Sequence, residues 1–138
     1  MGDPRALIER LTAAQNAHDV DGMLACFDAR YQSEQPLFPA RGFQGADQVR
    51  ANWSALLGAV PDFHAEVLRS AVEGDVVFAE IHWTGTKANG TRLEERGVLI
   101  FGIDDDRIAW ARLYVDEVDT EPTGIDAVVR RMAGTDGD

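Results

Sequence analysis

The pattern of apolar and polar residues changes along the chain from a helical period to an alternating one. The first helical group of apolar residues comprises Leu7, Ile8, Leu11 and Ala14. Asp3 suits the cap of this helix, and Pro4 suits its first position. A second, short helix is expected after Asp19, which suits a helix cap, and its buried face would comprise Met23, Leu24 and Phe27. A third helix should run from about Ala46 to Val60, where Pro61 stops it.

Strands are expected in the stretch 31–38 and through most of the second half of the chain. The residues with the alternation and side-chain types of strands fall in the ranges 63–72, 76–86, 93–103 and 108–118, with turn-forming residues between them. The connections are short enough for hairpins. Helices followed by consecutive antiparallel strands predict an α+β fold with the helices collected on one face of a curved sheet.

The end of the chain is expected to be less ordered than the rest. A last short helix is predicted over residues 125–132, and the glycine-rich tail 134–138 is predicted to be mobile. With 138 residues, 45% of them hydrophobic and 27% charged, the chain has the size and composition of one globular domain, placed here at residues 1–133.

The balance of charged residues argues against two classes of binding partner. Thirteen basic side chains oppose 24 acidic ones, for a net charge of -11, which argues against nucleic acid and against anionic membranes. No apolar run is long enough to span a bilayer and the N-terminus does not resemble a leader peptide, so a cytoplasmic location is expected. The single cysteine, Cys26, lies in an apolar run and is expected to be buried and inert.

Cofactor motifs are absent from the sequence. The histidines His18, His64 and His82 fall in unrelated predicted elements and do not have metal-ligand spacing. There is no phosphate-binding loop, dinucleotide glycine pattern or serine-hydrolase elbow. We therefore expect no cofactor and no metal, and cofactor-free acid–base chemistry if the protein is an enzyme.

Several short stretches, in their order along the chain, resemble the nuclear transport factor 2 superfamily, and specifically its SnoaL-like branch. They are residues 16–22, 42–46, 82–86, 97–101 and 114–116. The resemblance implies a cone-shaped fold in which a curved antiparallel sheet wraps around helices and encloses a pocket for a small apolar organic ligand. The same superfamily contains isomerases, cyclases, hydrolases and proteins without catalytic activity, so the fold does not select the reaction.

The catalytic residues of two enzyme classes of the superfamily can be compared with the matching positions of this chain. Where ketosteroid isomerases carry their catalytic aspartate, this chain has Gln35, and an amide cannot accept the substrate proton. The positions of the acid–base residues of limonene epoxide hydrolases fall near Glu80, His82 and Leu113. Neither complete set of catalytic residues is present.

The candidate acid–base residues are Glu80 and His82, which alternate onto one face of a predicted strand, with Glu34 as an additional acid or base. A carboxylate beside an imidazole can fix its tautomer and raise its basicity. The alternative interpretation is that Glu80 and His82 form a polar patch on the sheet surface. Glu34 has the same alternative, as an exposed strand residue.

Residues expected to bind the substrate complete the predicted site. Large side chains that could form the wall of an apolar cavity, or offer a hydroxyl or indole group to a ligand, are those of Tyr31, Phe38, Trp53, Leu113 and Tyr114. Arg96 could bind a carboxylate or an enolate, and ion pairing with Glu94, Glu95 or Asp116 is the simpler explanation for it.

An apolar outer sheet face is also expected, with Ile81, Trp83 and Trp110 on the side opposite Glu80 and His82. Exposed apolar faces often mark interfaces, and members of the resembled superfamily commonly pair through this face, so a homodimer is expected. The functions left open are a cofactor-independent cyclase, isomerase or hydrolase acting on an apolar carbonyl or epoxide compound, a non-catalytic ligand-binding module, and a dimerisation or regulatory module.

Overall fold

The computed structural model describes residues 2–135 and confirms the predicted α+β architecture. Three helices precede most of the sheet: α1 (Pro4–Asn16), α2 (Val20–Leu24) and α3 (Ala46–Ala59). The strands are β1 (Phe27–Glu34), β2 (Phe43–Gln44), β3 (His64–Glu73), β4 (Val76–Thr86), β5 (Arg92–Asp104) and β6 (Arg107–Glu117). A 3-10 turn, η1 (Pro39–Arg41), precedes β2, and α4 (Ile125–Ala133) follows the sheet.

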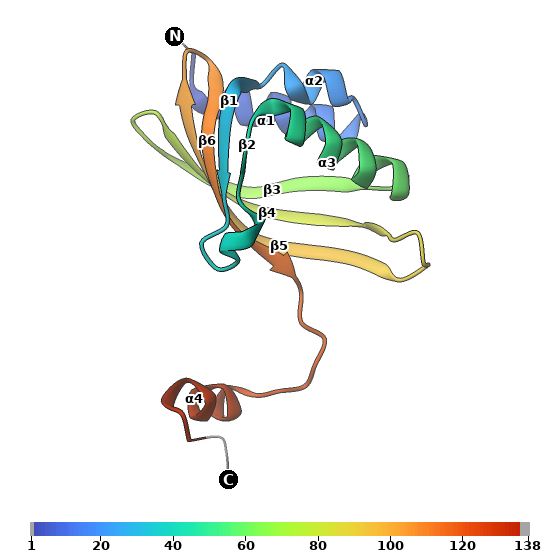
Figure 1. Cartoon of the computed structure of the whole chain (residues 1–138), viewed down its shortest axis with the longest axis vertical. Coiled ribbons are helices and arrows are strands. Elements are labelled where there is room, and N and C mark those ends of the chain that lie inside the picture. Colours follow the sequence, from blue (N-terminus) through green and yellow to red (C-terminus); the bar gives the residue numbers. More distant parts are fainter. Residues whose placement is uncertain (1, 136–138) are drawn as a thin grey trace.

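The strands form one curved sheet in the order β2-β1-β6-β5-β4-β3. Neighbouring strands are antiparallel except β1 and β6, which run parallel. The helices α1, α2 and α3 lie on the concave side of the sheet, whereas α4 extends away from it on a linker (Figure 1). Within residues 2–135, β3 is an edge strand with β4 as its only strand neighbour, and α1 packs beside it.

Local sequence signals explain where the first helices begin. The carboxylate of Asp3 accepts a hydrogen bond from the backbone nitrogen of Arg5 at 3.0 Å, and Pro4 occupies the first helical position of α1. Asp19 caps α2 in the same way, accepting from the backbone nitrogen of Gly22 at 2.9 Å. These caps satisfy N–H groups that have no partner within their helices.

The first strand begins earlier than expected, and this corrects the predicted place of Phe27. Helix α2 ends at Leu24, and Phe27 opens β1, where it pairs with Ile108 of β6. The backbone nitrogen of Ile108 donates to the carbonyl oxygen of Cys26 at 2.8 Å. This segment is therefore hydrogen-bonded to β6 and does not continue the helix. The expected strand 31–38 therefore ends at residue 34, and a turn and η1 follow it.

The two faces of the sheet differ in what covers them. The inner face, packed against α1 and α3, carries the buried residues Ala65, Val77, Ala79, Ile81, Leu99, Phe101, Ala111 and Val115. The outer face carries the alternate residues, among them Phe78, Val98, Trp110 and Tyr114, which are 36–38% exposed. This difference in burial between the two sets of side chains shows which strand residues can reach the interior.

The predicted orientation of Ile81 and Trp83 is wrong. Ile81 is 3% exposed and Trp83 packs against the core, so both lie on the inner face rather than outside with Trp110. Only Trp110 of that predicted group lies on the outer face. Alternate strand residues point to opposite faces, so Glu80 and His82 point to the outer face and not to the interior.

The C-terminal helix was predicted within one residue of its observed end. Its apolar side chains Ile125, Val129 and Met132 are 72%, 52% and 82% exposed. Of the tail predicted to be mobile, residues 136–138 lie outside the described part of the chain. Within residues 2–135, no helix combines the length and apolar character needed to cross a bilayer.

Candidate active site on the inner face of the sheet

The expected contact between Glu80 and His82 is not formed. Both side chains lie on the outer face, and each has another partner: Glu80 pairs with Arg69 at 2.9 Å, and the Nε2 atom of His82 lies 2.8 Å from Glu94. The hydrogen bond from His82 is the largest cause that lowers the pKa of Glu94. The structure therefore supports the alternative interpretation, a polar patch on the sheet surface.

Three other predicted site residues also lie outside the interior. Glu34 alternates onto the outer face of β1 and lies 3.8 Å from Arg112, with both side chains more than half exposed. Arg96 lies 3.8 Å from Glu94, which is the ion pairing proposed as its simpler explanation. Tyr114 is 36% exposed on β6.

The remaining predicted residues are divided between the interior and a loop. Tyr31 is 4% exposed on the inner face of β1, and Trp53 and Leu113 pack against the core from α3 and β6. Phe38 lies in the loop before η1, where the guanidinium of Arg41 stacks over its ring at 3.8 Å. The structure thus keeps Tyr31, Trp53 and Leu113 together on the inner side.

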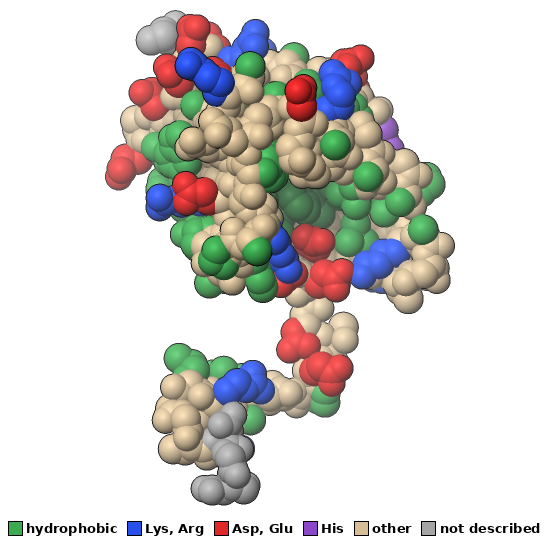
Figure 2. All heavy atoms as spheres, viewed as in Figure 1, with side chains coloured by type: hydrophobic (Ala, Val, Ile, Leu, Met, Phe, Trp, Pro, Cys, Tyr) green, Lys and Arg blue, Asp and Glu red, His purple; other side chains and the backbone are tan. Residues whose placement is uncertain are grey.

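A hollow opens between the β1–β2 side of the molecule and α3 (Figure 2). Hydrophobic side chains cover its depth, and acidic and basic side chains gather along one rim (Figure 2). Three aromatic rings pack edge to face or tilted on this side of the sheet: Trp53 lies 5.4 Å from Phe63 and 5.5 Å from Trp83, and Phe63 lies 6.1 Å from Trp83. Such an aromatic wall suits a flat apolar ligand.

The carboxyl group of Glu95 lies beside this aromatic wall. Trp83 of β4 pairs with Glu95 of β5, which pairs in turn with Glu117 of β6, so the three side chains form one row on the inner face. Leu93 and Leu99, on the same face of β5, are buried. Among the described residues, Glu95 takes part in no ion pair within 4.0 Å and no side-chain hydrogen bond.

The surroundings of Glu95 raise its pKa. Burial makes the largest contribution, because an apolar environment disfavours the ionised form, and the carboxylates of Glu117 and Asp116 add to the effect. Arg41 and Lys87 act in the opposite direction without cancelling it. Lys87 is itself held by Glu117, with its Nζ atom 2.6 Å from the Oε1 atom. Glu95 can therefore exchange a proton at a higher pH than an exposed glutamate can.

A buried hydroxyl group also lies on the inner face. Burial raises the pKa of Tyr31 to about 12, although its hydrogen bond with the side chain of Ser33 partly opposes that shift. Ser33 is 4% exposed, and the ring of Tyr31 packs against Phe27 at 4.7 Å and Phe43 at 6.0 Å. Tyr31 is thus a neutral phenol that can donate or accept a hydrogen bond, but not a base at physiological pH.

Glu95 was considered in the sequence only as an ion-pair partner of Arg96, and its place in the interior was missed. The signal was present in the alternation Leu93, Glu95, Gly97, Leu99, which inserts a carboxyl group into an otherwise apolar set. The described part of the chain contains no group of three or more histidine, cysteine, aspartate or glutamate side chains suited to hold a metal ion.

Replacing Glu95 with glutamine should stabilise the fold at high pH only. Because the pKa is raised on folding, the carboxyl group costs stability above the folded-state pKa and nothing below the unfolded-state pKa of about 4.3. Thermal unfolding of Glu95→Gln should show a higher midpoint than wild type at pH 8, with the difference vanishing near pH 3. Glu73→Gln, at an exposed position of β3, is the control, and an equal gain there would contradict the assignment.

Solved structures share the fold at low sequence identity. IdmH from Streptomyces antibioticus, a proposed polyketide cyclase, matches with a TM-score of 0.72 and 18% identity over 83% of this chain and 93% of that one. AclR from Streptomyces galilaeus, a proposed hydroxylase, matches with a TM-score of 0.71 and 20% identity over 95% and 90%. A SnoaL-like protein of unknown function from Burkholderia thailandensis matches with a TM-score of 0.64 and 24% identity over 84% and 94%.

Sequence comparison identifies the family. No curated protein sequence matches the chain. The model of the SnoaL-like domain matches residues 8–111, which extend from α1 into β6 and include Tyr31, Trp53, Trp83 and Glu95. This confirms the predicted resemblance, and the chain belongs to the SnoaL-like domain family.

Proposed function

We propose that the protein binds a small, largely apolar carbonyl compound in the hollow and catalyses a cofactor-independent proton transfer on it, with Glu95 as the general acid–base residue. The observation that carries this proposal is a partly buried carboxyl group, with a raised pKa and no close ion pair, in a row with Trp83 on the inner face. Perturbed carboxyl groups of this kind in apolar clefts are typical of acid–base sites.

The chemical step conserves protons. The ionised Glu95 accepts a proton from the carbon next to the carbonyl group, and the electron pair of that C–H bond forms an enolate. The protonated Glu95 then returns the proton to another carbon, giving an isomer, or to the alkoxide formed when the enolate carbon attacks a second carbonyl group, giving a ring. The fold shared with a proposed polyketide cyclase makes the second outcome our preferred reaction class.

The roles expected for Glu80, His82 and Glu34 are not retained in this proposal. Their side chains lie on the outer face, whereas the hollow and the aromatic wall lie on the inner one. A base must come within hydrogen-bonding reach of the proton that it removes. Tyr31, Trp53 and Leu113 keep their proposed role as residues that bind the substrate.

The proposal can be tested by exchange of carbon-bound protons. The probe is 2-tetralone, an uncharged bicyclic ketone that enolises readily. In D2O the protein should accelerate loss of its α-proton signals in the NMR spectrum above the buffer rate. Binding of 2-tetralone without any acceleration would instead favour a non-catalytic ligand-binding module.

We also propose that two copies of the chain pair through the outer sheet face. Exposed apolar side chains gather there on adjacent strands: Val98 pairs with Tyr114 across β5 and β6, and the ring of Trp110 lies over Gly102, where a Cβ atom would overlap it. A patch of this kind on a sheet rimmed by charges is typical of an interface.

Light scattering should give the mass of a dimer at micromolar concentration for wild type. Trp110→Glu should shift the mass to that of a monomer, because it places an additional negative charge in the centre of the patch of a chain that already carries -11. Leu37→Glu, at a 69% exposed position in the loop before η1, should leave the mass unchanged. A monomeric wild-type protein would contradict this assembly.

A further inference from the structure

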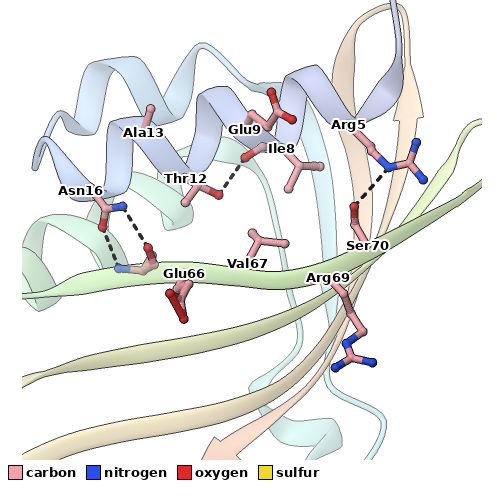
Figure 3. Close-up of a pocket in the computed structure, with 11 residues that line it drawn as sticks. Arg5, Ile8, Glu9, Thr12, Ala13, Asn16, Glu66, Val67, Arg69 and Ser70 are labelled. Carbon is pink, nitrogen blue, oxygen red and sulfur yellow. Dashed lines mark hydrogen bonds between the residues drawn. The ribbon is translucent and has the colours of Figure 1, made fainter.

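A second concave region lies between α1 and the edge strand β3. Its volume is about 540 Å³, within the range of small-molecule sites. Ile8, Thr12 and Ala13 line it from the helix, and Ala65 and Val67 line it from the strand (Figure 3). We refer to it as the α1–β3 groove.

Hydrogen bonds close both ends of the α1–β3 groove. At one end the side-chain amide of Asn16 donates to the carbonyl oxygen of Ala65 at 2.9 Å and accepts from its backbone nitrogen at 2.7 Å (Figure 3). At the other end the Nε atom of Arg5 donates to the Oγ atom of Ser70 at 3.2 Å (Figure 3). The spacing of helix and strand is therefore fixed before any ligand binds.

A small void lies beside the groove and shares part of its wall. Ile8, Thr12 and Val67 line both, and on the core side the void reaches Trp83 and Phe101. Its volume is about 10 Å³, roughly the room of one water molecule or of one ligand oxygen atom.

Gln15 places an unpaired amide group in the wall of this void. Its side chain is 5% exposed, and it makes no hydrogen bond with any residue in the range 2–135. The polar atoms of this amide are not fully enclosed, since every fully buried side-chain nitrogen or oxygen atom of the described residues has a hydrogen-bond partner. A ligand hydroxyl or carbonyl group could fill the void and bind the amide. The void thus has the polarity of a hydrogen-bonding subsite beneath an apolar groove.

The charges around the groove disfavour an anionic ligand. Both arginines at its rim are already engaged, Arg5 with Ser70 and Arg69 with Glu80 at 2.9 Å. The exposed carboxylates of Glu9 and Glu66 also line the groove, and neither takes part in an ion pair within 4.0 Å in the described part of the chain. A carboxylate or phosphate ligand would meet these charges without a free cation.

We propose that the α1–β3 groove is a second ligand site, which binds an uncharged, flat, mostly apolar molecule whose single hydroxyl or carbonyl group reaches the amide of Gln15. The site is separate from Glu95 and does not depend on the function proposed for the hollow. Ile8, Ala13 and Val67 contact the body of the ligand, and Gln15 selects for the polar group.

The wild-type protein tests the location of this site directly. Titration of 15N-labelled protein with 1-naphthol should shift the backbone amides of residues 9–16 and 65–70 in a saturable manner. Intermolecular NOEs should connect the naphthol ring to the methyl groups of Thr12 and Val67. Shifts and NOEs confined to the inner face around Trp53, Trp83 and Glu95 would overturn the proposal.

Variants test the contacts. Ala13→Trp, at an exposed groove position, should fill the groove and weaken 1-naphthol binding at least about tenfold, whereas Ala51→Trp on the exposed side of α3 should not. Gln15→Met should weaken 1-naphthol about tenfold and leave naphthalene unchanged, because naphthalene has no group for the amide to bind. Equal losses for both compounds, or unchanged binding by Ala13→Trp, would overturn the proposed contacts.

Discussion

Replacing Glu95 with glutamine is expected to lower the exchange rate of 2-tetralone protons by at least about a hundredfold, which is the contribution typical of a positioned general base. Glutamine keeps the size and one oxygen of the side chain, but its amide cannot accept the proton. Affinity for the ketone should stay within about threefold of wild type, because the aromatic wall of Trp53, Phe63 and Trp83 is unchanged.

The pH dependence of the same rate gives a second test. Glu95 must be ionised to act as a base, so the rate should fall as pH is lowered through its pKa. Burial and the neighbouring carboxylates place this fall above the pH at which an exposed glutamate would be protonated. Glu95→Gln should remove this dependence together with the activity.

The competing assignment of catalysis to the outer face is tested by Glu80→Gln. Since Glu80 pairs with Arg69 on the far side of the sheet from the hollow, its replacement should leave the exchange rate close to wild type. A large loss with Glu80→Gln and none with Glu95→Gln would contradict the proposed site and favour the original sequence-based prediction.

Most of the fold follows from signals that are local in the sequence. Asp3 and Asp19 mark helix starts because their carboxylates can cap free N–H groups, and the observed hydrogen bonds confirm both. The hairpins of β3 to β6 were placed within one residue at their ends, because turn residues interrupt each alternating run. Phe27 was misplaced because its pairing partner, Ile108, lies far away in the sequence.

The orientation of β4 could not be obtained from its own residues. Val77, Ala79 and Ile81 form one apolar set, but the opposite set also carries a large apolar residue, Phe78. Either set could face a core, and an error of one residue exchanges the two faces. Only the packing of α1 and α3 against the sheet decides between them, and that packing depends on contacts distant in sequence.

The same limit explains why Glu95 was missed. In the sequence it stands between Glu94 and Arg96, which suggests a solvated charged surface. In the structure, Glu94 and Arg96 lie together on the outer face at 3.8 Å, while Glu95 turns to the inner one. Its raised pKa results first from burial and then from the carboxylates of Glu117 and Asp116 on β6, which are distant from Glu95 in the sequence.

Replacing Gly97 with alanine is expected to destabilise the fold by about 3 kcal/mol, because the new Cβ atom has no space and the backbone no suitable conformation. Gly97 has a φ of 155°, a conformation that residues with side chains rarely adopt. A Cβ atom there would overlap the carbonyl oxygen of Tyr114 and lie 2.7 Å from the Cα atom of Val115. Since both are backbone atoms of the paired strand β6, relief would require the sheet itself to separate.

Urea denaturation measures this loss as a lower midpoint at an unchanged slope. Gly58→Ala is the matched control, because Gly58 lies in α3 with nothing within 4 Å of a new Cβ atom. There the substitution should stabilise the fold by about 0.5–1 kcal/mol, through reduced freedom of the unfolded chain. If the free energy of unfolding falls for Gly97→Ala and rises for Gly58→Ala, the loss at Gly97 comes from the close approach of β5 and β6. Equal small changes at both positions would mean that the strands can separate at Gly97 without penalty.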